Sequence, residues 1–558
     1  MTVAQTAERP SDKSEPQAAT VGDAIVASLA AAGVTDAFGV ISIHNMPILD
    51  GIARSGSLRF TPARGEAGAV NMADAATRVT GRPAVAITST GTGAGNGCGG
   101  LIEAACAGTP MLHVTGQIDS AYLDQGWGFI HEAKDQPGWL AATSKAFYRI
   151  ERPEHAARII AQALREALDP PTGPVSIEIP IDIQKAAAAE PESVADTPRH
   201  ARSDSDIDRL VEMAREARRP LLWLGGGARR ASDGARKLAD LGFGAVSSVQ
   251  GRGIVDERHP RSLGSFTATA ATEALYRQAD LLIVAGSHLR SNETRTYSLP
   301  LPSQIARIDI DGSARNGSYR ADLFVEADCG PALAHLEESL SGPLSIDPDW
   351  DAAINEAKAG NEANLRRDMG PYTELLDAIE ATLPSDALWV RDITLSNSIW
   401  GNRRPLLDRP DRLVHAVGGG IGQGLAHAIG AGHASGKPVL TLIGDGGFML
   451  NPGELATAVE AGLNLTILLM NDQGYGVIRN IQDASYGARR AYTDLSLPNF
   501  ADLALAFGCT YHRIDDLTRA RPILAERFER GGVGILEVDM KAIGPFGVTF
   551  AGPPAGRG

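Results

Sequence analysis

The sequence is poor in cysteine, in aromatic residues and in long apolar runs. Its four cysteines show no CxxC spacing, so we interpret them as small buried side chains in a reducing cytosol. No apolar run approaches the roughly 18 residues of a membrane span, so no membrane contact is expected. Lys and Arg number 52 against 67 Asp and Glu, and the resulting net charge of −15 argues against a nucleic-acid partner.

The amino-terminal segment lacks the apolar stretch of a signal peptide. Residues 1–18 are polar, and we expect a disordered tail on a cytoplasmic protein. A chain of 558 residues is too long for a single core, so about three domains are expected. Changes in composition place these domains at 19–187, 204–341 and 371–558, with linkers at 188–203 and 342–370.

Short apolar runs alternate with helical patterns in each of the three segments. Such alternation predicts an α/β fold class, with three doubly wound parallel sheets that are covered by helices. The first and third segments share this layout without a visible sequence repeat. The expected strands include 35–41, 58–63, 83–90, 109–116, 173–180, 220–228, 244–249, 280–287, 304–311, 386–393, 412–417, 438–445, 465–471 and 533–539.

Two turns in the third segment carry the clearest chemistry. One apolar run ends in GDGG, which contains Asp445, Gly446 and Gly447, and the next ends in NDQG, which contains Asp472. Both turns follow parallel strands, so we expect them at the sheet edge where α/β proteins bind ligands. The glycines let N–H groups approach an anion, and the two carboxylates offer oxygen ligands. We interpret the site as one for a hard cation, Mg²⁺ above all, bridging the protein to a diphosphate. For GDGG alone, a plain strand-to-helix turn is the alternative.

These turns resemble the metal and diphosphate motif of thiamine-diphosphate-dependent enzymes, a GDG followed by a paired Asn. The resemblance implies Mg²⁺ ligands at Asp445, Asp472 and the main-chain carbonyl of Gly474. Asp472 stands where the family usually has Asn, and its carboxylate adds negative charge beside the diphosphate. The resemblance covers nearly the whole chain and implies the three domains of the decarboxylase and carboligase superfamily: pyrimidine-binding, central and diphosphate-binding.

The segment RGEAGA opens a helix in the first domain and puts Glu66 at its start. An acidic residue at a helix N-terminus has a plain structural explanation. In the family, however, this motif surrounds the catalytic glutamate, which implies that Glu66 stabilises the imino tautomer of the aminopyrimidine. The turn TSTGTGAGN, with Thr92 and Asn96, resembles the family's TSGPGATN turn and should pack by the pyrimidine. A glycine-rich turn without a ligand is the alternative.

Two further catalytic candidates come from the resemblance alone. Gln117 follows a strand where acetolactate synthase and benzaldehyde lyase carry an active-site glutamine, and His44 falls where benzaldehyde lyase has an active-site histidine. Both would orient the reacting groups, and a histidine can also relay protons. A surface glutamine and a satisfied turn histidine are the alternatives. His131 and Lys145 lie in a region that borders the substrate in acetolactate synthase, but we interpret them as structural or surface residues.

The run VGGGIGQG resembles the GxxxMGxG run of acetolactate synthase. The match puts Ile421 at the apolar wedge that bends the cofactor and Gly419 at the carbonyl that accepts its 4′-amino group; the bend acts by proximity. A glycine-rich helix entrance without a ligand is the alternative. Among the polar residues that start at Asp392, Thr394 is the expected hydrogen-bonding partner of the diphosphate. Tyr475 is expected beside the cofactor and the substrate pocket.

The resemblance implies an enzyme that depends on thiamine diphosphate and Mg²⁺ and acts through ylid and enamine intermediates. It would be an acetolactate-synthase-like lyase or carboligase, with benzaldehyde-lyase-like features, for small 2-oxo acids or 2-hydroxy ketones. A 2-oxo acid decarboxylase, a 2-hydroxyacyl-CoA lyase and a non-catalytic regulatory homologue are the alternatives. The family builds each site from two subunits, which implies a homodimer at least and commonly a homotetramer. The GGGA turn at 225–228 lacks GxGxxG spacing, so FAD is not favoured in the central domain.

Overall fold

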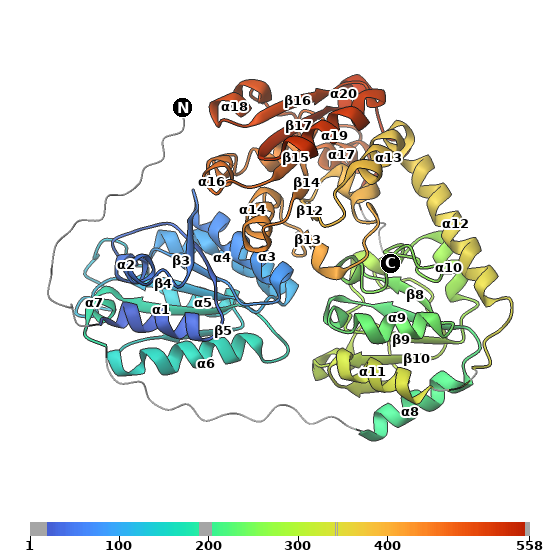
Figure 1. Ribbon diagram of the computed structural model, residues 1–558, viewed down its shortest axis with the longest axis horizontal. Helices are drawn as coiled ribbons and strands as arrows, with labels where there is room; N and C mark the ends of the chain where they lie inside the picture. Colours follow the sequence, from blue (N-terminus) through green and yellow to red (C-terminus); the bar gives the residue numbers. More distant parts are fainter. Residues whose placement is uncertain (1–18, 189–203, 341, 343, 553–558) are drawn as a thin grey trace.

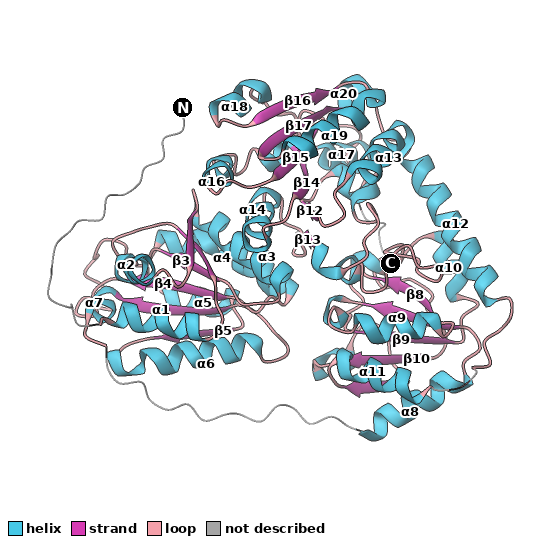
Figure 2. Ribbon diagram, in the orientation of Figure 1, coloured by secondary structure: helices cyan, strands magenta, loops and turns pink. Residues whose placement is uncertain are grey.

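The computed structural model describes residues 19–188, 204–340, 342 and 344–552. The expected tail at 1–18 and most of the expected linker at 188–203 lie outside these residues. Three all-parallel sheets with flanking helices stand at the corners of a triangle, with the first domain in blue, the central domain in green and the third in orange and red (Figures 1 and 2). The predicted α/β fold class with three parallel-sheet domains is confirmed.

The first sheet has the strand order β2-β1-β3-β4-β6-β5. Its inner strands are buried along their whole length, as expected for a parallel sheet covered on both faces. The elements are α1 (Val21–Ala31), β1 (Asp36–Gly39), α2 (Met46–Ser55), β2 (Arg59–Pro62), α3 (Glu66–Thr80), β3 (Val85–Thr88), α4 (Thr92–Ala107), β4 (Leu112–Gln117), α5 (Gln136–Thr143), β5 (Ala146–Arg149), α6 (Ala156–Leu168), β6 (Val175–Pro180) and α7 (Ile181–Lys185).

The central sheet has five strands in the order β11-β10-β9-β7-β8. Its elements are α8 (Asp204–Glu216), β7 (Pro220–Leu224), α9 (Ser232–Asp240), β8 (Gly244–Ser247), α10 (Ala270–Tyr276), β9 (Leu281–Ala285), β10 (Ile305–Asp309), β11 (Leu323–Glu326) and α11 (Cys329–Ser339). A long helix, α12 (Trp350–Met369), occupies most of the segment 342–370 and leads to the third domain (Figure 1).

The third sheet has the strand order β13-β12-β14-β15-β17-β16. Counted from its first strand, this order is the same as that of the first sheet, so the two domains share one topology. The elements are α13 (Thr373–Thr382), β12 (Leu388–Arg391), β13 (Leu413–His415), α14 (Gly424–Ser435), β14 (Val439–Gly444), α15 (Asp445–Phe448), α16 (Glu454–Glu460), β15 (Leu465–Asn471), α17 (Gly476–Ser485), α18 (Phe500–Ala506), β16 (Thr510–Ile514), α19 (Ala520–Arg530), β17 (Val533–Asp539) and α20 (Met540–Ile543).

In both six-stranded sheets the direction of strand addition reverses at one point, which lies between β1 and β3 in the first sheet and between β12 and β14 in the third. In doubly wound sheets, ligands bind at the carboxyl ends of the strands beside such a reversal. In the third domain this point lies between β12 and β14, which are hydrogen-bonded neighbours. The fold therefore puts the end of β12, with Asp392, next to the GDGG turn that follows β14.

The first and third domains share one hydrophobic core, built largely between α3 and α14. Small residues let the two helices approach closely: a Cβ on Gly430 of α14 would lie 2.1 Å from the main-chain oxygen of Met72 on α3. Helix α3 begins with Glu66, and α14 follows the loop that carries Ile421. The packing of these helices thus fixes two predicted site segments relative to one another.

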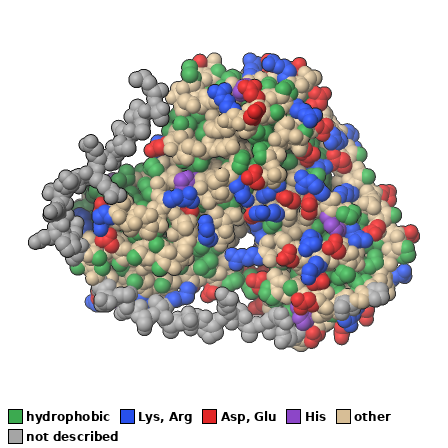
Figure 3. Space-filling view, viewed as in Figure 1, with side chains coloured by type: hydrophobic (Ala, Val, Ile, Leu, Met, Phe, Trp, Pro, Cys, Tyr) green, Lys and Arg blue, Asp and Glu red, His purple; other side chains and the backbone are tan. Residues whose placement is uncertain are grey.

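The surface view shows no single-sign face over the central and third domains, where acidic and basic side chains are interspersed (Figure 3). Among the helices of the described residues, none combines the length and the apolar character that a membrane crossing requires.

Candidate active site

The two acidic turns of the third domain come together, as their positions after neighbouring strands predict. Strands β14 and β15 pair in parallel up to Gly444 and Met470. Asp445 begins α15 directly after β14, and Asp472 follows the last residue of β15. The register therefore delivers both carboxylates to the same edge of the sheet.

The two glycines at the end of the GDGG turn, Gly446 and Gly447, are packed too tightly for side chains. A Cβ on Gly446 would lie 2.6 Å from the Tyr475 ring and 3.4 Å from the main-chain oxygen of Gly474. A Cβ on Gly447 would lie 3.1 Å from a carboxylate oxygen of Asp392. The missing side chains bring the Gly474 carbonyl and the Tyr475 ring against the turn, so the predicted ligand carbonyl is part of the same cluster.

The Asp445 carboxylate is buried, with 1% of the residue exposed. It accepts N–H groups from Gly446 at 2.8 Å and Gly474 at 2.9 Å, and no Lys, Arg or His of the described residues forms an ion pair with it. Burial, and then the charge of Asp472, raises the pKa of Asp445 to about 7. Burial also raises the pKa of Asp472, although the Arg479 guanidinium opposes this shift. Among the described residues, only Asp472 has a cationic partner, the Arg479 guanidinium at 4.0 Å. Two neighbouring carboxylates and a carbonyl fit a divalent cation that prefers oxygen ligands.

Asp392 has a structural role that the sequence did not single out. Its carboxylate is fully buried and accepts the N–H groups of Ile393 at 2.6 Å, Gly422 at 2.8 Å and Gly424 at 3.3 Å. Burial raises its pKa to about 6, against the effect of these N–H groups. Asp392 therefore fixes the carboxyl end of the loop that carries Gly419 and Ile421.

The tip of this loop is presented to solvent. Gly419 has a φ of +85° and Gly422 a φ of +82°, backbone conformations that favour glycine. Ile421 lies between them and is 40% exposed. Thr394 lies beside the GDGG turn, where its hydroxyl accepts the N–H of Ser396 at 3.0 Å. The loop thus offers an apolar side chain close to the acidic cluster.

Glu66, Thr92 and Asn96 form a second group, at the carboxyl edge of the first sheet. Glu66 is the first residue of α3, and its carboxylate accepts a hydrogen bond from the Asn96 side chain at 3.1 Å. Gly93 makes room for this carboxylate, because a Cβ there would lie 2.9 Å from Glu66 Oε1. Thr92 and Asn96 are exposed. A half-buried glutamate is therefore held by a neutral donor at an open surface.

Comparison with known proteins decides the family. Three models of thiamine pyrophosphate enzymes match the chain: the N-terminal TPP-binding domain at 19–138, the central domain at 207–336 and the C-terminal TPP-binding domain at 396–538. A probable 2-ketoarginine decarboxylase of Pseudomonas aeruginosa is 31% identical over 536 residues, covering 93% of this chain and 94% of that protein. The chain belongs to the thiamine pyrophosphate enzyme family.

Acetolactate synthases are also relatives of this thiamine pyrophosphate enzyme. The large subunit of isozyme 1 from Escherichia coli is 27% identical over 535 residues, covering 94% of both chains. Acetolactate synthase 1 of Nicotiana tabacum is 27% identical over 546 residues, covering 92% of this chain and 81% of the relative. The resemblance predicted from the sequence motifs is confirmed over nearly the whole chain.

Gln117 and His44 lie side by side in this thiamine pyrophosphate enzyme. A Cβ on Gly116, next to Gln117, would lie 2.0 Å from the main-chain oxygen of His44. The Gln117 amide is buried: its oxygen accepts from Thr90 and from the N–H of Ile118, both at 2.8 Å. The structure therefore brings both candidates to the end of β4. The side-chain amide oxygen of Gln117 already accepts two hydrogen bonds from the protein.

The His44 ring makes an edge contact with His131, with 5.1 Å between the ring centroids. Burial, followed by the charges of His131 and Lys185, lowers the pKa of His44. His44 is thus held as a neutral imidazole at physiological pH, a form that both donates and accepts a proton. Lys145 points elsewhere, because its ammonium donates to the main-chain oxygens of Glu166 and Asp169.

A buried glutamate next to Gln117 was missed by sequence reasoning. Glu178 of β6 accepts hydrogen bonds from Gln117 at 3.1 Å, Gln136 at 2.6 Å and Arg149 at 2.5 Å. Burial raises its pKa, and the Arg149 charge opposes that shift. The available signal was a lone acidic residue inside the apolar run GPVSIEIP, since charged residues are rarely buried unless they are paired.

The Glu66 group and the Asp445 group do not meet within one chain. No hydrogen bond or ion pair among residues that the structure describes joins them. Instead, the start of α3 meets the third domain at Glu454 of α16, which accepts the N–H of Arg64 at 3.1 Å. The two groups therefore lie at the carboxyl edges of two different sheets, without a direct polar contact between them among the described residues.

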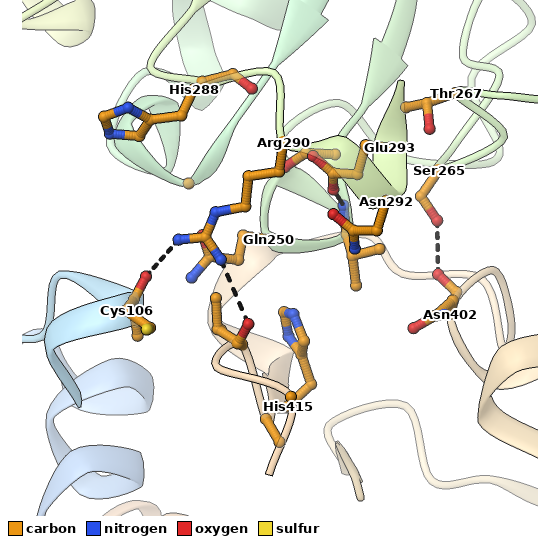
Figure 4. A pocket seen from close by; sticks show the side chains of 18 of the residues that line it. Cys106, Gln250, Ser265, Thr267, His288, Arg290, Asn292, Glu293, Asn402 and His415 are labelled. Carbon is orange, nitrogen blue, oxygen red and sulfur yellow. Dashed lines mark hydrogen bonds between the residues drawn. The ribbon is translucent and has the colours of Figure 1, made fainter. Parts of the chain in front are cut away.

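A cavity of about 860 Å³ opens at the carboxyl edge of the central sheet (Figure 4). The GGGA turn, Gly286 and Asp309 form its central-domain wall, and His415 and Val417 of the third domain form part of the opposite wall. Arg290 crosses the rim and donates to the carbonyl of Cys106 at 2.6 Å. The cavity therefore borders the start of the loop that carries Ile421.

Proposed function

We propose that the protein is a thiamine-diphosphate- and Mg²⁺-dependent carbon–carbon lyase or carboligase for 2-oxo acids or 2-hydroxy ketones. The observation that carries the proposal is the Asp445 carboxylate, buried without a cationic partner among the described residues and next to a second carboxylate, Asp472. Family membership and the acetolactate synthase relatives support the same chemistry.

The residues of the third domain fit the cofactor's charged end. Asp445, Asp472 and the Gly474 carbonyl would hold Mg²⁺, and the turn formed by Gly446 and Gly447 would lie against the diphosphate, a use of glycine turns that is common for phosphates. Thr394 and Tyr475 would complete this wall. Bound thiamine diphosphate supplies an electron sink for cleavage of a bond beside a carbonyl.

The remaining residues act on the ring end and on the substrate. Glu66 would hold a proton at the pyrimidine, since Asn96 steadies its carboxylate without adding charge. Gly419 would accept a hydrogen bond at its carbonyl, and Ile421 would exclude water and fix the ring geometry, which is a contribution of proximity. Gln117, whose side-chain NH₂ group also donates to Glu178 at 3.1 Å, and the neutral His44 would orient the substrate oxygen. No step in this proposal uses FAD.

A homodimer is the smallest unit that this proposal requires, and a homotetramer is its expected form. The support is that the Glu66 group and the Asp445 group lie at the edges of different sheets, and no hydrogen bond or ion pair joins them among the described residues. A second copy that brings its first domain to the third domain of this chain would complete both sites. The proposed setting is the cytoplasm, as for an enzyme of small-molecule metabolism.

A 2-oxo acid decarboxylase is the second candidate. The relative named a probable 2-ketoarginine decarboxylase is the observation that favours it, since it matches over 93% of this chain. The two candidates share the site and differ in the fate of the group left after the first cleavage, which is either protonated or added to a second carbonyl. A non-catalytic homologue is disfavoured because Glu66 and Asp445 are both present.

The test is turnover by the full-length protein with thiamine diphosphate, Mg²⁺ and a panel of 2-oxo acids and 2-hydroxy ketones that includes pyruvate and 2-ketoarginine. CO₂ release and products would be followed by mass spectrometry. Glu66→Gln should reduce turnover by at least about 100-fold, a usual effect of removing an acid–base group. Glu460→Gln, at an exposed glutamate paired with Arg64, is the matched control and should leave turnover unchanged. Full activity of Glu66→Gln, or no binding of thiamine diphosphate to the wild type, would overturn the proposal.

A further inference from the structure

The loop that carries Gly419 and Ile421 is held at its start by a residue of the first domain. Glu103 of α4 is 1% exposed, and its two carboxylate oxygens accept the N–H groups of Val417 at 2.5 Å and Gly418 at 2.7 Å. This is a charge-assisted, two-pronged contact between residues 314 and 315 positions apart in the chain.

An arginine fixes the Glu103 carboxylate in turn. Arg78 of α3 donates to Glu103 at 3.0 Å, to Asp74 through Nε at 2.8 Å, and to the carbonyl of His415 at 2.7 Å. The Arg78 side chain is only 6% exposed, so little solvent screens the pair. Arg78 and Glu103 together hold the chain from His415 to Gly418, directly ahead of the loop tip.

The central domain also contacts the segment that starts the loop, through hydrogen bonds from Arg290. Arg290 donates to the main-chain oxygen of Val417 at 3.4 Å and to that of Cys106, on α4, at 2.6 Å (Figure 4). Val417 therefore has its N–H bound to the first domain and its carbonyl bound to the central domain. At the other end of the loop, the N–H of Gly422 donates to Asp392. The tip from Gly419 to Ile421 therefore lies between two segments that are each fixed by a buried carboxylate, Glu103 before the tip and Asp392 after it.

We propose that Glu103 is a positioning residue for this loop: by fixing Val417 and Gly418 it sets where Gly419 and Ile421 meet the ring end of the cofactor. This inference rests on the proposed function. Glutamine at this position offers one acceptor oxygen in place of two, and its NH₂ group faces N–H donors. The loop start would then lose at least one hydrogen bond, while the acidic cluster at Asp445, which binds the charged end, would keep all its contacts.

The test compares two ligands by calorimetry in the presence of Mg²⁺: thiamine diphosphate and inorganic diphosphate. In Glu103→Gln, the Kd for thiamine diphosphate should rise at least about tenfold, the loss expected for one hydrogen bond to a charged group. The Kd for inorganic diphosphate should stay within about twofold, since that ligand does not reach the loop tip. An equal rise for both ligands would indicate general damage to the fold and would overturn the positioning role.

Two variants make the comparison decisive. Asp74→Asn removes the buried carboxylate charge that faces Arg78 and His427 but leaves the contacts of Glu103 with Val417 and Gly418 in place, so it should weaken binding of thiamine diphosphate less than Glu103→Gln does. If it weakens binding as much as Glu103→Gln does, the charge network rather than the loop contact is responsible, and the proposal is wrong. Gly418→Ala places a Cβ 3.0 Å from Glu103 Oε2 and should reproduce the selective loss, which keeps the test valid if Glu103→Gln does not fold. Wild-type protein that binds inorganic diphosphate but not thiamine diphosphate would refute the proposed function itself.

Discussion

The charge of Asp472 helps to raise the pKa of Asp445, and the two residues lie at the ends of hydrogen-bonded strands. The family usually has a neutral Asn at the second position, so this chain carries one more negative charge next to its predicted metal. In the absence of metal, the two carboxylates repel one another in a poorly solvated turn. The predictions about metal and pH start from this relationship.

The metal-free protein should lose stability at this site as the pH rises from about 4 to about 7. Folded Asp445 keeps its proton up to about pH 7, whereas the unfolded chain releases it near the ordinary value of 3.8. The folded state therefore binds the extra proton in this window, and its advantage declines as the pH rises, by roughly 4 kcal/mol in all. Thermal unfolding of the wild type and Asp445→Asn at pH 5 and pH 8 measures this effect as the difference between the two proteins.

Added Mg²⁺ should abolish that pH-dependent difference near neutral pH, because the cation pairs with the ionised carboxylates and stabilises the folded state by mass action. Asp445→Asn should show little stabilisation by the metal. Equal stabilisation of both proteins by Mg²⁺ would place the metal elsewhere.

Asp472→Asn should bind Mg²⁺ more weakly than the wild type when no diphosphate is present. One full charge about 4 Å from a divalent cation is worth about 8 kcal/mol at an effective dielectric constant of about 20, so even with screening a loss of at least about tenfold is expected. Calorimetric titration with Mg²⁺ alone measures it. The matched control is Asp483→Asn, at an exposed ion pair with Arg490, which should leave the affinity unchanged. Tighter binding by Asp472→Asn would show that repulsion between the carboxylates outweighs their attraction for the cation.

Ile421→Ala should reduce turnover by about 100-fold while shifting the unfolding temperature little. The side chain is 40% exposed, so its removal costs little packing in the folded protein. If it sets the geometry of the bound cofactor, a small misplacement is enough to cost about 100-fold in rate. Leu505→Ala, at a side chain that is 79% exposed on α18, is the control and should change neither quantity. A large fall in stability with unchanged turnover would make Ile421 a packing residue.

The three strands that were not named from the sequence, β5, β11 and β16, each lie at an edge of their sheet. All the inner strands were named, and so were the opposite edge strands β2, β8 and β13. In β5 and β16 most residues are only half-buried, so their sequences lack the continuous apolar run that marks a strand covered on both faces. Edge strands take their conformation from a neighbour, and that information is not local.

The site residues also divide into those that local sequence predicts and those whose roles depend on distant partners. Asp445, Gly446, Gly447 and Asp472 were predictable because each directly follows an apolar strand, and the order of such strands places their ends together. Glu103 was not predictable in its role, since its partners lie more than 300 residues away in another domain. Only the folded chain shows which buried carboxylate meets which N–H group.

Gly430→Ala should lower the stability of the protein, because α3 and α14 touch through their backbones. The new Cβ would lie 2.1 Å from the Met72 main-chain oxygen, an atom that no rotamer change can move. Overpacking of this kind costs about 1–3 kcal/mol, and a lower midpoint of thermal unfolding is expected.

Gly99→Ala is the matched control: a Cβ at that helical glycine meets nothing within 4 Å, so the variant should gain about 0.5–1 kcal/mol from a stiffer unfolded chain. The same shift of α14 would move the loop that precedes it, so Gly430→Ala should also weaken binding of thiamine diphosphate. If its unfolding midpoint matches that of Gly99→Ala, the two helices do not meet at this glycine, and the shared core of the first and third domains is held elsewhere.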